Sequence, residues 1–151
     1  MKQEVSWLDL PKIGDPSKGY LTAAEPAFRG LPFEIKRAVW LYGLEPGMVR
    51  GRHANRRCHQ VFFCLAGELD IEADLGIYPS QYPDVYHLDA GLSGTLNRGL
   101  YMSPLVWRTL TKFTPGTVVL ILSSEPYDEK DYIRDYEEFL KEVEAWKVHA
   151  K

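Results

Sequence analysis

The sequence has few cysteines, and this scarcity argues against a fold held together by disulfide bonds. Among its 151 residues there are two, Cys58 and Cys64, which lie six positions apart. An extended strand places residues with that spacing roughly 20 Å apart, whereas bridged cysteines need α-carbons within about 7 Å of each other. We therefore expect two reduced thiols in or near the core.

Long apolar runs, a leader segment and a strong net charge are also missing. No run approaches the roughly 20 apolar residues of a membrane span. Met1 to Glu4 carry neither the basic nor the apolar part of a signal peptide. The net charge of −3 gives no general attraction to nucleic acids or anionic membranes. These absences favour a cytoplasmic protein without a membrane or nucleic-acid partner.

The chain does contain a series of short apolar segments separated by glycine and proline. With 45% hydrophobic and 26% charged residues it has an ordinary globular composition, and its length suits one domain over residues 1–151. The segments predict an antiparallel sandwich or barrel over residues 4–123. The expected strands lie at residues 5–10, 20–24, 35–42, 61–65, 69–73, 85–88, 100–102, 106–111 and 117–122, of which 61–65 is apolar on both faces, as in a buried strand.

Two further segments differ from this strand pattern. Between residues 128 and 148, apolar side chains recur every three or four positions, which predicts a helix with one apolar stripe. We expect the helix to pack on the barrel, although a partner-binding helix is the alternative. The segment 74–98 is rich in Gly, Pro, Tyr and Ser and predicts a long loop, a feature that is often functional.

The most informative stretch runs from Gly47 to Gly67. Its spacing is a glycine, five residues, His53, one residue, Asn55, four residues, Gln60, six residues and a second glycine. In a strand, residues two apart share a face, so His53 and Asn55 point the same way. The spacing resembles the first motif of the cupin superfamily, with Asn55 and Gln60 in place of a histidine and a glutamate. That resemblance implies an all-β, jelly-roll barrel.

The resemblance extends to a narrower family, the cupin-type sugar 3,4-ketoisomerases that act on dTDP-4-keto-6-deoxyglucose. It covers about residues 13 to 145. It rests on the segments 32–37, 50–54, 60–61, 64–67, 99–101, 104–107 and 127–136, of which the Asp-Tyr-Ile-Arg-Asp-Tyr run at 131–136 is the most specific. It implies a homodimer that exchanges N-terminal strands and needs no metal or other cofactor. It also implies a nucleotide-sugar product for bacterial surface glycans or glycosylated natural products.

The chain departs from the family pattern where the chemistry is expected. Asn55 replaces the second motif histidine, and Arg108 follows Trp107 where the family commonly has Trp-His. Lys18 stands for an arginine in an early turn, and Val39 for a tyrosine. Each change removes a candidate acid, base or phenol, or alters a cation.

Ketone migration between C4 and C3 of a hexose requires a proton acceptor with a pKa near neutral. Histidine suits this task, so His53 is the expected base, with Tyr101 as a hydrogen-bonding or relay partner. Asparagine cannot shuttle protons, so Asn55 is expected to orient the sugar or polarise its keto oxygen. The alternative is that His53 is a structural histidine. A catalytic metal is the weaker hypothesis, because His53 alone survives of the motif's imidazoles and no histidine follows directly after Pro104.

The nucleotide diphosphate requires cations, and the sequence offers several. Arginine pairs well with phosphate oxygens, and Arg37, Arg50 and Arg52 would lie near the barrel mouth, with Lys18 or Lys36 assisting. Trp107 and Tyr101 are candidates for stacking on the base or sugar. The expected substrate-binding residues are Lys18, Arg37, Arg50, Arg52, Trp107 and Arg108. The alternatives are solvated charges on a rim and aromatic core residues.

Three functions follow from these observations. The leading one is an isomerase that acts on a dTDP-linked 4-keto-6-deoxy sugar through an enediol. The second is a barrel that binds a nucleotide-sugar but has lost the proton shuttle, which Asn55 and Arg108 motivate. The third is a cupin with a different sugar reaction.

Overall fold

The protein is described by a computed structural model that covers residues 2–26, 30–77, 82–91 and 96–149. Its strands are β1 (Val5–Asp9), β2 (Ile13–Asp15), β3 (Gly19–Leu21), β4 (Arg37–Leu44), β5 (Arg50–Asn55), β6 (Gln60–Ala66), β7 (Glu68–Asp74), β8 (Asp84–Asp89), β9 (Arg98–Met102), β10 (Trp107–Thr111), β11 (Thr117–Ser123) and β12 (Tyr132–Ile133). A short 3-10 turn (Glu129–Asp131) and one helix, α1 (Tyr136–His149), complete the described elements.

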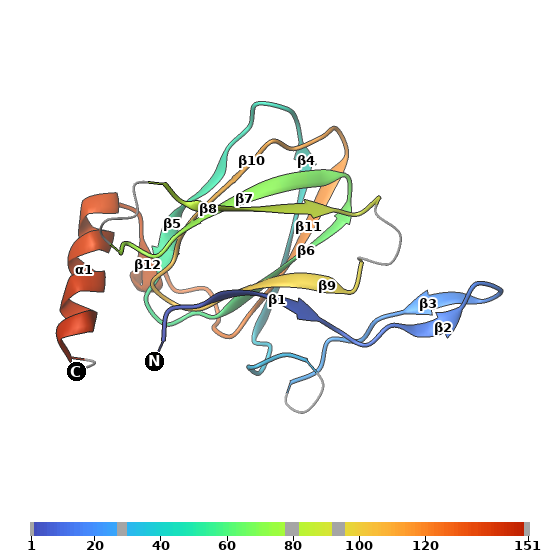
Figure 1. The fold of residues 1–151 in the computed structure, drawn as a ribbon, viewed down its shortest axis with the longest axis horizontal. Helices are drawn as coiled ribbons and strands as arrows, with labels where there is room; N and C mark the ends of the chain where they lie inside the picture. The colour runs from blue at the N-terminus through green and yellow to red at the C-terminus, as the bar shows by residue number, and fades with distance from the viewer. Residues whose placement is uncertain (1, 27–29, 78–81, 92–95, 150–151) are drawn as a thin grey trace.

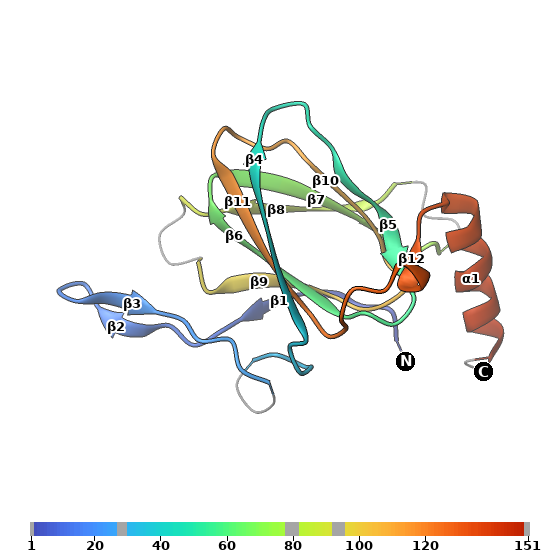
Figure 2. The ribbon, with the colours of Figure 1, turned by 180° about the vertical axis from the view of Figure 1, so that it is seen from behind.

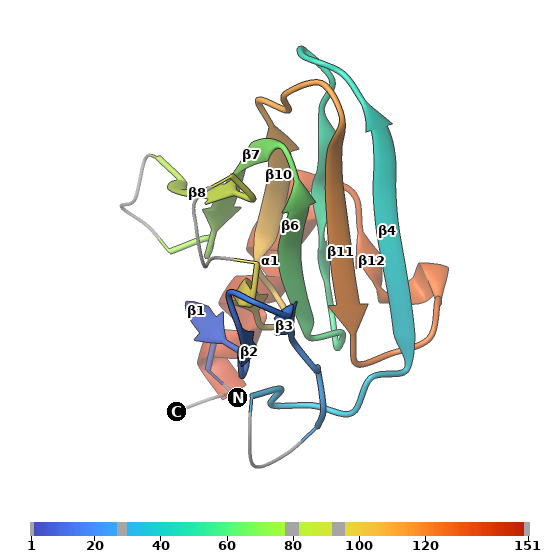
Figure 3. The same ribbon diagram turned by 90° about the vertical axis from the view of Figure 1, so that its right-hand side faces the viewer.

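Two five-stranded antiparallel sheets form the body of the protein. One has the order β1-β9-β6-β11-β4 and the other the order β12-β5-β10-β7-β8. They face each other as the walls of a flattened barrel, and α1 lies across one end (Figures 1 and 3). The expected all-β, cupin-like barrel with a C-terminal helix is confirmed.

The central strand β6 shows why this stretch of sequence is apolar on both faces. Phe62 and Cys64 point into the main core between the sheets. Val61 and Phe63 point the other way, into a second cluster covered by Leu10 and other N-terminal residues. Both faces are therefore shielded from water, as expected for a fully buried strand. Cys64 and Cys58 are free, buried thiols, as predicted.

The helix begins later than predicted. The segment from residue 128 forms the 3-10 turn and then β12, in which Tyr132 pairs with Asn55 and Ile133 with Ala54. Ile133 is fully buried, so pairing with β5 and burial together override the helical periodicity. Asp135 then accepts a hydrogen bond from the Glu138 amide at 2.8 Å, which caps the start of α1. The packing of α1 on the barrel agrees with the expectation, because Phe139 and Val143 are buried against it.

The turn that contains Lys18 connects two short strands, β2 and β3, in a β-hairpin. β2 and β3 pair with each other and make up a separate two-stranded sheet. The hairpin extends away from the barrel (Figures 1 and 2). Ile13, Tyr20 and Leu21 are each more than half exposed on it.

The region expected to be a long loop contains a complete strand, β8, which pairs along β7 from Asp84 to Asp89. This strand includes the expected segment 85–88. The parts of the loop at 78–81 and 92–95 lie outside the described residues. Across the described chain, no helix has the length and apolar character needed to cross a membrane.

Candidate active site

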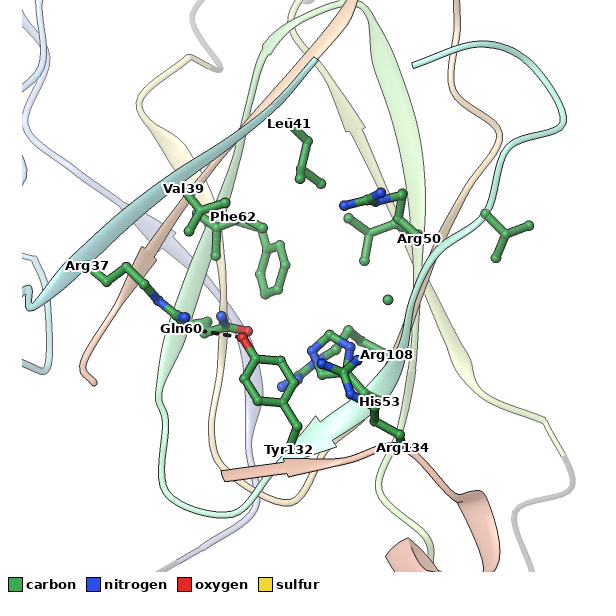
Figure 4. Close-up of a pocket in the computed structure, with 14 residues that line it drawn as sticks. Arg37, Val39, Leu41, Arg50, His53, Gln60, Phe62, Arg108, Tyr132 and Arg134 are labelled. Carbon is green, nitrogen blue, oxygen red and sulfur yellow. Dashed lines mark hydrogen bonds between the residues drawn. The ribbon is translucent and has the colours of Figure 1, made fainter. Parts of the chain in front are cut away.

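A cavity of about 430 Å³ lies between the two sheets. Strands β4, β6 and β11 of one sheet and β5, β10 and β12 of the other supply its walls (Figure 4). Its lining residues are Arg37, Val39, Leu41, Val49, Arg50, Gly51, His53, Gln60, Phe62, Arg108, Leu110, Ile121, Tyr132 and Arg134. Polar and apolar side chains contribute about equally to this lining, and four of the polar ones are arginines.

His53 is the single histidine of this lining. Its ring lies 4.9 Å from the ring of Tyr132, between centroids, and its Nδ1 has no hydrogen-bond partner among the described residues. Burial, and then the positive charge of Arg108, lower the pKa of His53 to about 3. The imidazole is therefore neutral at physiological pH and carries an unused nitrogen, but its pKa lies well below the near-neutral value expected of the base.

Arg108 is the cross-strand neighbour of His53, because β10 and β5 pair these two residues. It is the largest fully buried side chain of the described chain. Its Nη1 donates to Asn55 Oδ1 at 2.5 Å and its Nε contacts Met102 Sδ at 3.2 Å. Burial lowers its pKa to about 10, which still leaves the guanidinium charged at neutral pH.

Asn55 lies behind Arg108 and not in the cavity lining. It is fully buried, and its Nδ2 donates to Asp131 Oδ2 at 3.0 Å while its Oδ1 accepts from Arg108. Asn55 is therefore not part of the lining, and the sugar contact expected from the motif stays a prediction.

Three further arginines line the cavity. Arg37 Nη2 donates to the Tyr132 hydroxyl at 3.3 Å, and Figure 4 shows this contact across the cavity. Arg50 and Arg134 line the cavity with exposed side chains. Arg37 and Arg50 were expected here; Arg134 was not.

Four other expected residues lie elsewhere in the described chain. Tyr101 bonds to His59 Nδ1 at 2.8 Å, outside the lining. Trp107 packs against Tyr136 and Phe139 beneath α1, because the alternation of β10 turns it away from the face that carries Arg108. Two exposed cations complete this set, Arg52 beside the cavity wall and Lys18 in the β2–β3 turn.

Comparison with known proteins places this site in a family. The chain matches the family described as FdtA: WxcM-like, C-terminal, over residues 3–144. It is 34% identical over 136 residues to a TDP-4-oxo-6-deoxy-alpha-D-glucose-3,4-oxoisomerase of Aneurinibacillus thermoaerophilus, covering 90% of each protein. The chain belongs to the sugar 3,4-ketoisomerase family.

Solved structures of family members have the same fold. The 3,4-ketoisomerase QdtA of Thermoanaerobacterium thermosaccharolyticum, in complex with TDP, is 34% identical, with a TM-score of 0.82 and coverage of 93% of this chain and 95% of QdtA. The TDP-quinovose 3,4-ketoisomerase WlaRB of Campylobacter jejuni is 33% identical, with a TM-score of 0.79 and coverage of 91% and 97%. The family resemblance seen in the motifs is confirmed.

The family segment at 131–136 contributes more to the site than sequence reasoning assigned to it. Tyr132 and Arg134 line the cavity because β12 adds to the edge of β5 next to His53. The family-specific Asp-Tyr-Ile-Arg-Asp-Tyr run could have indicated site residues in this segment. Because the segment was predicted to be helical, its extended conformation was not expected. Gln60 and Phe62, at the start of β6, were also missed as lining residues.

One group among the described residues has donor atoms spaced for a metal, and it lies away from the cavity. Glu68, His87 and Asp89 meet on the paired strands β7 and β8. His87 Nδ1 bonds to Asp70 at 2.7 Å and its Nε2 contacts Glu68 at 3.1 Å. These carboxylates raise the pKa of His87, Asp70 most strongly, which favours an ion-paired imidazolium over a metal ligand.

Proposed function

We propose that this protein is an isomerase that moves the keto group of a TDP-linked 4-keto-6-deoxy sugar between C4 and C3. The observation that carries the proposal is His53, a neutral imidazole with a free nitrogen in a cavity of sugar size. The named relatives act on TDP-4-oxo-6-deoxyglucose and TDP-quinovose, and a histidine-to-asparagine mutant of QdtA is solved in complex with TDP-4-keto-6-deoxyglucose.

His53 acts as the general base in this proposal. It takes the proton from C3, and the C–H electron pair forms a C3=C4 double bond while the C4 carbonyl pair moves to oxygen. The protonated imidazole returns the proton at C4, and the hydroxyl proton passes from O3 to O4. Hydrogen and electrons balance without an added oxidant, so no redox cofactor enters. We assign the hydrogen-bonding role expected of Tyr101 to Tyr132, because Tyr132 lines the cavity.

The diphosphate is held at the exposed side of the cavity. Arg50 presents an exposed guanidinium there, and Arg37 and Arg134 belong to the same lining, Arg134 being already paired with Glu129 at 2.6 Å. Guanidinium groups bind phosphate oxygens in pairs, and this arrangement leaves the interior, with His53, for the sugar. Arg52 and Lys36 remain solvated or assist from the rim.

We also propose a homodimer in which the N-terminal hairpin reaches a second copy. The hairpin pairs with no other strand in the described chain and exposes Ile13, Tyr20 and Leu21, which favours burial against a partner. Lys18 lies in the β2–β3 turn, so in such a dimer it would reach the partner's substrate site. Light scattering checks this: the wild type should have twice the chain mass, and Ile13→Asp with Leu21→Asp should lower it. An unchanged dimer in that variant would contradict hairpin exchange.

The biological setting remains the one expected from the sequence, a cytoplasmic step in the supply of deoxysugars for surface glycans. The test of the reaction itself is proton exchange. TDP-4-keto-6-deoxyglucose in deuterated buffer should lose its C3 proton signal and give the 3-keto product with wild type, and neither change should occur with His53→Asn. Lys141→Met, on the exposed face of α1, is the matched control and should behave as wild type.

The second candidate is a nucleotide-sugar-binding barrel without catalysis, and the replacement of two of the family's histidines by Asn55 and Arg108, with His53 retained, favours it. Calorimetry separates it from the isomerase. Tight TDP binding by wild type with no deuterium exchange would support the binding protein. Exchange at C3 without 3-keto product would instead indicate a different sugar reaction, the third candidate.

A further inference from the structure

The buried guanidinium of Arg108 lacks a counter-ion in direct contact. Among the described residues, Asn55 Oδ1 and Met102 Sδ are its side-chain hydrogen-bond acceptors, and both are uncharged. The carboxylate of Asp131 lies beyond Asn55, which it holds by a separate hydrogen bond. Burying a charge without a paired opposite charge is unfavourable. Such a cation is expected where a ligand supplies the missing negative charge.

One donor of this cation is unused. Arg108 Nη2 is buried and has no hydrogen-bond partner in the described chain, and Arg108 lines the same cavity as His53. Directly opposed cross-strand residues have Cβ atoms roughly 5 Å apart, so β10 and β5 hold the guanidinium beside the imidazole. Figure 4 shows the two side chains together at one end of the cavity. The unused donor therefore lies next to the proposed base.

The burial of Arg108 distinguishes it from Arg50, the exposed cation proposed to bind phosphate. Arg50 is exposed, whereas Arg108 is 1% exposed. A diphosphate at the exposed side leaves the sugar's reacting carbons at the inner end. Arg108 thus faces the part of the substrate on which charge changes during the reaction.

We propose that Arg108 stabilises the negative charge that develops on the sugar oxygen during isomerisation, and that Asn55 and Asp131 position it. The inference rests on the proposed function. When His53 takes the C3 proton, the carbonyl electron pair moves to O4, and Arg108 Nη2–H donates to that oxygen. The hydroxyl proton then passes from O3 to O4, the O3 electron pair forms the C3=O bond, and the C3=C4 electron pair takes the proton at C4. No proton leaves Arg108 at any stage.

This assignment gives a physical role to the two replacements in the family motif. Asn55 accepts from Nη1 and donates to Asp131, so its amide fixes the guanidinium plane without neutralising it. A carboxylate at position 55 would pair with Arg108 directly and remove the charge that the transition state needs. Fixed charges in a water-excluded site stabilise developing oxyanions strongly, so Arg108 adds an electrophile where the family commonly has a histidine.

Substitution of Arg108 tests the proposal. Arg108→Met replaces the arginine by a long, apolar side chain and so removes the charge. Loss of one oxyanion donor lowers turnover by roughly 10²–10³-fold, so kcat should fall by that factor, while calorimetric TDP affinity stays within about threefold of wild type. Lys141→Met should retain wild-type kcat. If Arg108→Met retains wild-type kcat, the proposal is overturned.

Chemical rescue makes the test independent of folding defects. Arg108→Ala opens space at the inner end of the cavity, and added guanidinium at millimolar concentration should restore kcat at least tenfold. An equal gain with sodium chloride, or no gain in a variant that still binds TDP, would overturn the proposal. Inactivity of the wild type itself would overturn the proposed function as well, so the two failures are distinguishable.

Asn55→Leu tests the positioning role. The variant is similar in shape but cannot bond to Arg108 or Asp131. Its kcat should fall about tenfold with an unchanged KM, and the NMR signals of the Arg108 guanidinium should shift. A merely structural role would alter thermal stability without moving those signals, and that result would contradict the assignment of Asn55.

Discussion

The depressed pKa of His53 predicts a specific dependence of stability on pH. In the folded protein, burial and the charge of Arg108 lower the pKa from 6.5 to about 3. Between these values the unfolded chain binds a proton at His53 that the folded protein does not. By linkage, folding stability must fall as the pH falls through this window.

The size of the effect follows from the two pKa values. At pH 5 an unfolded histidine with a pKa of 6.5 is almost fully protonated, whereas His53 in the folded state stays neutral. Relative to pH 7, this difference removes about 2 kcal/mol of folding free energy. Other groups also titrate in this range, so the effect is isolated by comparison with a variant that lacks the imidazole.

The assay is urea unfolding at pH 7 and pH 5 for wild type and His53→Asn. Wild type should lose about 2 kcal/mol more than the variant between the two pH values. His149→Asn, which removes an exposed imidazole near the C-terminus, should follow wild type. Equal losses in wild type and His53→Asn would refute the reasoning. As a direct check, the NMR titration of His53 should move to higher pH in Arg108→Met, because the neighbouring charge is gone.

Three further predictions concern the framework of the site. Gly51 has φ +82°, and a Cβ there would lie 2.8 Å from the Arg108 carbonyl oxygen. Gly51→Ala should therefore destabilise the protein by about 1–3 kcal/mol in urea unfolding. Gly47→Ala should destabilise it less, because Gly47 has a similar φ of +88° but a Cβ there would meet no atom within 4 Å. Equal losses would argue against this contact. Arg56 pairs with Glu142 at 2.6 Å and Glu138 at 2.7 Å on α1 and also donates to the carbonyl of Tyr132. Arg56→Met should therefore lower the unfolding free energy by about 1–3 kcal/mol. An unfolding free energy as little changed as in the control Lys141→Met would contradict this expectation. Trp107→Ala should lower the unfolding free energy by about 3 kcal/mol, because the indole packs under α1, and should change the TDP affinity measured by calorimetry only slightly. A large loss of affinity at unchanged stability would instead support a role of Trp107 in stacking on the ligand.

Much of the framework could be predicted because it depends on local pattern. Alternation and turn residues place β4, β6, β10 and β11 close to their expected ranges, since burial of alternate side chains acts over a few neighbouring residues. The spacing of the Gly47 to Gly67 motif identified His53 for the same reason: a strand determines which of its residues share a face.

Elements that need a distant partner were predicted less well. Tyr132 and Ile133 belong to a helical periodicity in the sequence, yet pairing with β5 draws them into a strand. Nothing in the local sequence around Arg56 indicates an ion pair, but α1 brings Glu138 and Glu142 to it. In both cases the deciding contact joins segments more than seventy residues apart, which periodicity cannot represent.

The sequence by itself determined a jelly-roll barrel of the sugar 3,4-ketoisomerase family with His53 as the surviving imidazole. It could not determine what surrounds that imidazole. The pairing of β10 with β5 brings Arg108 beside His53, and β12 brings Asp131 to Asn55. These contacts arise from sheet register, so only the tertiary structure decided that two apparent losses from the motif form one buried, charged arrangement.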